Sequence, residues 1–196
     1  MYGIYPELGL LYPPREPSIP AEEKGRAFAR WVSAYYSPVP KGVAIAPESL
    51  QARVELSDLT PTLCALSKSE LEDMTEPSAV LRSGAILQTA GEIHQQNVHR
   101  AFLQPDLVLP SVDVVALWCD KSVWVCLWAV KFLQELLEQG SAAGKANRQV
   151  QFLEVKNANH FVRYQLLILR LSFPESVLQY HWDEPEQFVR LLSELL

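Results

Sequence analysis

A short apolar run rich in β-branched residues constrains the fold of this chain more than any other feature. It covers residues 112–119 (VDVVALWC), and its length and composition are typical of a strand buried on both faces of a sheet. A helical pattern follows over about 123–139, and we expect Gly140 to end that helix. A second strand is expected over Val150–Val155 (VQFLEV). A strand, a helix and a strand with short links predict parallel pairing with a right-handed crossover.

The first half of the chain shows no such strand pattern, and we expect residues 1–110 to form an irregular helical layer. The longest predicted helix there covers 21–36, where Phe28, Trp31, Val32 and Tyr35 recur at helical spacing. We expect further helices near 61–66, at 69–74 and over about 90–103. The second region, 111–196, would hold the strands and close on a helix. Asp183 and Glu186 stand at capping-box spacing before that helix.

Charge and hydropathy argue against a nucleic-acid-binding protein and against a membrane-spanning one. The net charge is −6 and the pI is near 5.3, with no cluster of Lys and Arg among aromatics, so we expect no binding to nucleic acid. The most apolar stretch, 114–133, is interrupted by Asp120, Lys121 and Lys131, so we expect a buried strand and helix there rather than a membrane span.

The cysteines predict a reducing compartment. There are three, Cys64, Cys119 and Cys126, and their spacing fits no zinc site, so we expect core thiols and no metal or other cofactor. The N-terminus lacks a basic segment followed by an apolar core, which argues against a secretory signal. A cytoplasmic location follows as an expectation.

Two loops of the predicted sheet bring together residues with catalytic potential. Residues 120–122 follow the first strand and 157–162 follow the second, so both are expected at the carboxyl edge, where open parallel sheets bind ligands. One loop supplies Asp120 and the other His160. A carboxylate that accepts a hydrogen bond from one imidazole nitrogen orients the ring and leaves the other nitrogen as a general base.

Three short motifs then resemble a known family. Residues 118–122 (WCDKS), 157–162 (NANHFV) and 181–185 (HWDEP) look like the last two strands and closing helix of an α/β-hydrolase. They are most similar to fungal members whose ends run W-G-D-R-S and G-A-N-H-F-V-H-W-D. The resemblance implies a partial α/β-hydrolase fold of class α/β, in which His160 is the catalytic base. Asp120 is the candidate acid from its place after the first strand, and an acid on a strand outside this sequence stays open as the alternative.

The same resemblance implies a helical cap over the pocket, formed by residues 1–110. It also implies a small apolar ester-like or related substrate in the complete family. Residues 163–180 interrupt the family motif, and deleting them restores its spacing. We therefore expect an insertion there, from a retained intron, and a chain truncated at its N-terminus.

One departure decides what the chain does by itself. No G-x-S-x-G nucleophile elbow occurs in the sequence, so we expect the isolated chain to be an inactive fragment of a hydrolase. Ser122 also occupies the position where relatives often carry their acid.

Three alternatives stay open. One is a non-catalytic α/β binding or interaction module with the same core. Another pairs Cys119 with His160 as a cysteine nucleophile and its base. A small all-α protein would require residues 112–119 to be helical, against their β-branched content. The other histidines, His94, His99 and His181, are interpreted as surface or packing residues.

Overall fold

The computed structural model describes residues 9–74 and 91–161. The elements in chain order are η1 (Pro13–Arg15), α1 (Lys24–Ser33), α2 (Pro47–Gln51), η2 (Thr62–Ala65), α3 (Lys68–Met74), α5 (Gly91–Leu103), β1 (Val114–Cys119), α6 (Trp124–Ala142) and β2 (Val150–Val155). Three predictions lie outside the described residues: the insertion at 163–180, the closing helix behind Asp183 and Glu186, and the placement of His181.

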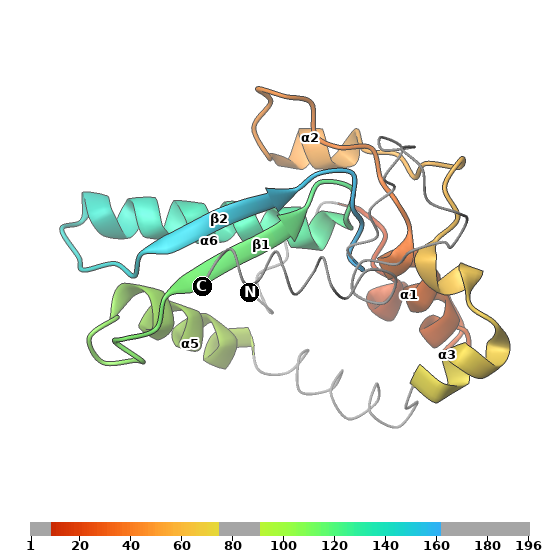
Figure 1. Ribbon diagram of the computed structural model, residues 1–196, viewed down its shortest axis with the longest axis horizontal. Coiled ribbons are helices and arrows are strands. Elements are labelled where there is room, and N and C mark those ends of the chain that lie inside the picture. The colour runs from red at the N-terminus through yellow and green to blue at the C-terminus, as the bar shows by residue number, and fades with distance from the viewer. Residues whose placement is uncertain (1–8, 75–90, 162–196) are drawn as a thin grey trace, which may run out of the picture.

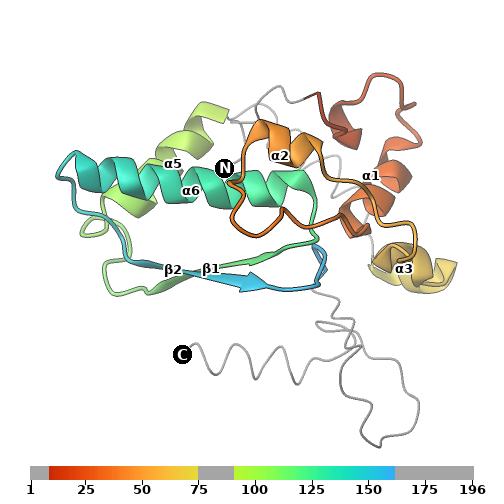
Figure 2. The ribbon, with the colours of Figure 1, turned by 90° about the horizontal axis from the view of Figure 1, so that it is seen from above.

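The two predicted strands pair in parallel, as expected. The register runs from Val114 opposite Val150 to Cys119 opposite Val155, and α6 connects the strands and packs along the sheet (Figure 2). The described chain is therefore a mixed helical protein with a small two-stranded parallel sheet, which agrees with the α/β class. None of the helices within these ranges is long and apolar enough to span a membrane.

Strand β1 is less buried than its sequence predicts. Its first five residues are half-buried, and only Cys119 is fully buried. The reason is visible in Figure 2, where α5 and α6 lie on one side of the sheet and no described helix covers the other. The expectation of a strand buried on both faces is wrong for the described part of the chain.

The helical first half packs against the start of α6. Trp31 and Val32 of α1 and Leu50 of α2 form a buried cluster with Val123, Trp124 and Leu127. The indole Nε1 of Trp124 also donates to the carbonyl of Leu11 at 3.0 Å. In both ribbon views α1 and α3 lie beyond the carboxyl ends of the strands (Figure 1). Helices α1 and α3 are thus held at the edge of the sheet where ligands bind in this architecture.

Helix α1 is shorter than predicted because its last residues form other contacts. The helix ends at Ser33, and Ala34 is already extended. Tyr36 then forms an antiparallel bridge with Glu55 and donates its amide to the carbonyl of Lys121 at 3.0 Å. The segment near 61–66 also differs from expectation, since it forms the 3-10 helix η2 behind Pro61.

The prediction that Gly140 ends α6 is wrong. The helix continues to Ala142, and Gly144, with φ +68°, is the left-handed residue that follows its end. Gly140 is buried inside the helix, where a Cβ atom would lie 2.4 Å from Asn147 Oδ1 and 2.8 Å from Leu103 Cδ2. Glycine at 140 therefore permits α5 and the loop after α6 to approach closely.

A buried arginine fixes the start of both strands. Arg148 is only 8% exposed, and its guanidinium donates to the carbonyls of Ala101, Val108 and Val112. Its amide donates to the carbonyl of Phe102 at 2.8 Å. Arg148 therefore joins the end of α5 and the segment before β1 to the residues that lead into β2.

Candidate functional site

The two loops predicted to carry the chemistry lie side by side. The amide of Asp120, after β1, donates to the carbonyl of Val155 at 3.1 Å. The next amide, of Lys121, donates to the carbonyl of Ala158 at 3.0 Å. Asp120 and His160 thus emerge at the same end of the strands, and His160 lies in a loop rather than in a helix. The predicted placement of both loops is confirmed.

The loop that carries His160 is anchored by its neighbour Asn159. This side chain is fully buried, and its Nδ2 donates to the carbonyl of Ser33 at 2.6 Å and to Thr62 Oγ1 at 2.8 Å. Its Oδ1 accepts the amide of Phe161 at 2.9 Å. Both N–H groups and the oxygen of the side-chain amide therefore have fixed hydrogen-bond partners. Asn159 ties the histidine loop to α1 and η2.

The carboxyl group of Asp120 is turned toward the backbone of the neighbouring loop. It is 5% exposed and accepts hydrogen bonds from the amides of Asn157 and Ala158, while its Oδ1 has no hydrogen-bond partner among the described residues. Burial raises the pKa of Asp120, and the charge of Lys156 and the two amides partly oppose this effect. Asp120 therefore supports the shape of the loop that leads to His160.

No hydrogen bond or ion pair joins Asp120 to His160 within the part of the chain that the structure describes. The imidazole instead contacts α6, where its Nδ1 lies 3.3 Å from the sulfur of Cys126. The ring also stacks edge-to-face on Phe161, with 5.7 Å between centroids. His160 keeps an exposed side, while desolvation by its packed side lowers the pKa of the imidazole. The two predicted site residues share an edge but have different partners.

Cys126 was missed as a site residue because its apolar surroundings suggested a core thiol. It is partly exposed and lies in the first turn of α6, just after the carboxyl edge of β1. That position was the available signal, since a helix that follows a parallel strand begins at the ligand-binding edge. The alternative thiol, Cys119, is buried beside Val155 and Ala158. Burial raises the pKa of Cys119 to about 12, and no hydrogen bond joins it to His160 among the described residues.

Arg53 is a second residue that the sequence did not single out. Its Nε donates to the carbonyl of Ser37 at 2.6 Å and its Nη2 to the carbonyl of Asp120 at 3.0 Å. The guanidinium lies over the ring of Tyr36, 5.7 Å from the centroid. Burial lowers the pKa of Arg53 to about 10, although the carboxylate of Asp120 opposes this effect. Arg53 brings a positive charge from the helical region to the loop after β1.

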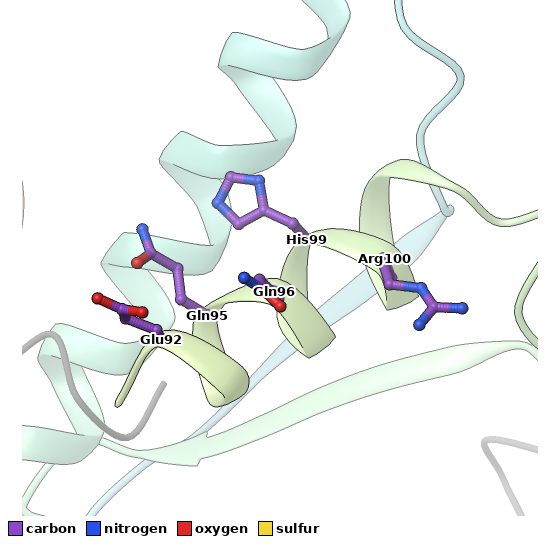
Figure 3. Close-up of a pocket in the computed structure, with 5 residues that line it drawn as sticks. All are labelled: Glu92, Gln95, Gln96, His99 and Arg100. Carbon is purple, nitrogen blue, oxygen red and sulfur yellow. The ribbon is translucent and has the colours of Figure 1, made fainter. Parts of the chain in front are cut away.

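A separate hollow of about 640 Å³ lies on α5. Figure 3 shows that its lining comes from one helix, and the residues are Glu92, Gln95, Gln96, His99 and Arg100. His99 is half-buried rather than a plain surface residue, but the lining holds no nucleophile. Across residues 9–74 and 91–161, no group of three or more His, Cys, Asp and Glu side chains is placed to hold a metal ion.

The chain was also compared with known proteins. No family model, curated protein or solved structure matches it.

Proposed function

We propose that this chain is the C-terminal part of an α/β-hydrolase-fold hydrolase of the esterase or epoxide-hydrolase class, in which His160 is the general base. The observation that carries the proposal is the position of His160. It lies on an anchored loop at the carboxyl edge of two parallel strands, beside the loop of the preceding strand. A rigid loop at this edge suits a base that must be held within reach of a nucleophile.

The protonation state of His160 suits the same role. A general base must be neutral before it takes a proton. Desolvation lowers the pKa of His160 below its ordinary value, so the ring is mostly neutral at pH 7. Nδ1 faces Cys126, which leaves Nε2 as the nitrogen for a serine hydroxyl proton.

The proposal assigns the nucleophile and the oxyanion donors to residues outside this sequence, because it contains no G-x-S-x-G motif. The half-buried β1 supports this view. Its apolar residues suit a sheet covered on both faces, yet they are only partly covered among the described elements. The helical region at the carboxyl edge would act as the cap, and the substrate would be a small apolar ester-like or related molecule.

A cytoplasmic location belongs to the same proposal. The three cysteines are free thiols, as is usual in a reducing compartment.

The hydrolase itself is tested by sequencing the transcript and expressing its whole reading frame. We expect an in-frame G-x-S-x-G motif upstream of Met1, and labelling of its serine by a fluorophosphonate probe. The substitution His160→Ala should abolish labelling, and His99→Ala on α5 should leave it unchanged.

The hydrolase proposal fails if the transcript begins at Met1 and encodes residues 163–180. It also fails if the present chain reacts with the fluorophosphonate probe and loses this reaction in His160→Ala. That second result would require a serine nucleophile within this sequence.

A non-catalytic interaction module is the second candidate, and one observation favours it. The segment before β1 exposes three large apolar side chains: Leu107 at 76%, Leu109 at 66% and Val112 at 46%. A monodisperse chain that unfolds cooperatively and binds a partner through these residues would favour the module. Aggregation that is relieved by adding the upstream part of the reading frame would favour the hydrolase.

A further inference from the structure

The sulfur of Cys126 and the imidazole of His160 form a contact that the proposed hydrolase does not require. The Sγ to Nδ1 distance is 3.3 Å, which is within the range of a hydrogen bond that involves sulfur. Both residues are open to solvent in part, since Cys126 is partly exposed and His160 is exposed. The thiol of Cys126 is therefore in contact with a proton acceptor whose residue is open to solvent.

Three further groups face this sulfur and favour negative charge on it. The hydroxyl of Ser122 is buried beside Cys126, where it lowers the pKa of the thiol, and it has no other hydrogen-bond partner among the described residues. The positive charge of Arg53 acts in the same direction. Cys126 also lies in the first turn of the 19-residue helix α6, whose N-terminal end carries partial positive charge.

Burial has the opposite effect and determines the resting state. It raises the pKa of Cys126, and it lowers the pKa of His160. Both effects favour the neutral pair of a thiol and an imidazole over the ion pair. The thiol therefore holds its proton at neutral pH, and Nδ1 of His160 accepts this proton in the tautomer that carries the ring proton on Nε2.

We infer that Cys126 and His160 form a nucleophilic pair that captures soft carbon electrophiles, such as α,β-unsaturated carbonyl compounds, with His160 as the base. This inference is independent of the proposed hydrolase. It uses Nδ1 rather than Nε2 of His160, a nucleophile that the present chain contains, and a different class of reagent.

The reaction is an addition without a leaving group. The thiol proton moves to Nδ1 of His160 as the sulfur forms a bond to the β-carbon of the electrophile. The electrons of the carbon–carbon double bond move to the carbonyl group, which becomes an enolate. The imidazolium then returns the proton to the α-carbon of that enolate. Ser122, Arg53 and the end of α6 stabilise the sulfur while it carries negative charge.

The test is the rate of alkylation by N-ethylmaleimide, resolved by mass spectrometry for each cysteine in the folded chain. Cys64 is the internal reference, because it is an exposed thiol on a different element, η2. In His160→Gln we expect the rate at Cys126 to fall by at least about tenfold, as for loss of a general base. The rate at Cys64 should change by less than about twofold. His99→Gln is the matched control variant, and it should leave both rates unchanged.

The pH profile provides a second readout that a merely structural role would not move. The titratable groups that interact with the sulfur are His160, Arg53 and Cys119. Arg53, with a pKa of about 10, stays charged and Cys119, with a pKa of about 12, stays neutral between pH 5 and 8. The rate at Cys126 should therefore rise as His160 loses its proton and then level off. In His160→Gln it should instead rise about tenfold per pH unit, with the thiolate fraction.

Two results would overturn the inference. One is that Cys126 resists alkylation in the folded chain and reacts only in urea. The other is that Cys126 reacts at the same rate, with the same pH profile, with and without the imidazole of His160. Circular dichroism of each variant identifies any loss of fold, and Cys126→Ser confirms the assignment of the modified peptide.

Discussion

The substitution Asn159→Asp tests the anchor of the histidine loop with the smallest possible change. It replaces Nδ2 by an oxygen of similar size. The carbonyl of Ser33, in a residue with no exposed surface, then loses its donor at 2.6 Å, and Thr62 Oγ1 loses its donor at 2.8 Å. Thr62 compensates by turning its hydroxyl proton toward the new carboxylate, but the carbonyl of Ser33 has no such freedom.

The expected loss of stability is about 3 kcal/mol at pH 8. This figure combines about 1–3 kcal/mol for a buried acceptor without a donor with the cost of burying a carboxylate. Protonation of the new carboxyl group restores a donor, so the pKa of the group is raised in the folded state. The folded variant then binds more protons than the unfolded chain, and its stability must rise as the pH falls.

Urea unfolding followed by tryptophan fluorescence measures both effects, because Trp31 and Trp124 lie in the buried cluster. Asn97→Asp is the matched control, since Asn97 is exposed on α5. We expect a large difference in unfolding free energy between the two variants at pH 8 and a smaller one at pH 5. If Asn159→Asp is as stable as Asn97→Asp at pH 8, the anchor described above does not exist.

Two further substitutions test the packing that supports the site. Gly140→Ala should destabilise the chain by about 1–2 kcal/mol, because its Cβ overlaps Asn147 and Leu103. Gly25→Ala in α1 is its control, because a Cβ there meets nothing within 4 Å; it should be neutral or stabilising by up to about 1 kcal/mol. Equal effects of alanine at 140 and at 25 would contradict the packing described above. Arg148→Lys should cost about 2–4 kcal/mol, since one ammonium group cannot serve three separate carbonyls. Arg26→Lys, at an exposed position, should be neutral, and thermal unfolding compares the members of each pair.

The sequence predicted the parts of this fold that depend on short-range pattern. The apolar strands β1 and β2, the helix between them and their parallel pairing all follow from periodicity and link length. The shared edge of Asp120 and His160 follows from that pairing, because parallel strands place their carboxyl ends together.

The contacts within the site could not be predicted in the same way, because they depend on residues far apart in the chain. Asn159 reaches Ser33, which is 126 positions away, and Arg53 reaches the backbone of Asp120, which is 67 positions away. These anchors decide how the loops present their side chains. Asp120 therefore binds the loop amides and His160 contacts Cys126, whereas their shared edge of the sheet suggested a direct pair.

Gly140 illustrates the same limit at a single position. A glycine near the end of a helical pattern usually marks the end of the helix. Here Gly144 has that role, and Gly140 is required by close contact with Leu103 and Asn147. Only the packing of α5 on α6 distinguishes the two glycines.

The most direct test of the central claim is the titration of His160 by NMR in the folded chain. The claim is that a neutral imidazole stands at the carboxyl edge against Cys126, without a carboxylate partner. Desolvation then sets the midpoint of the titration. We expect this midpoint to lie below about 6.5, which is the ordinary pKa of histidine and the value we expect in the urea-unfolded chain. A midpoint above that of the unfolded chain would mean that a negative charge holds the imidazolium, and it would contradict the account.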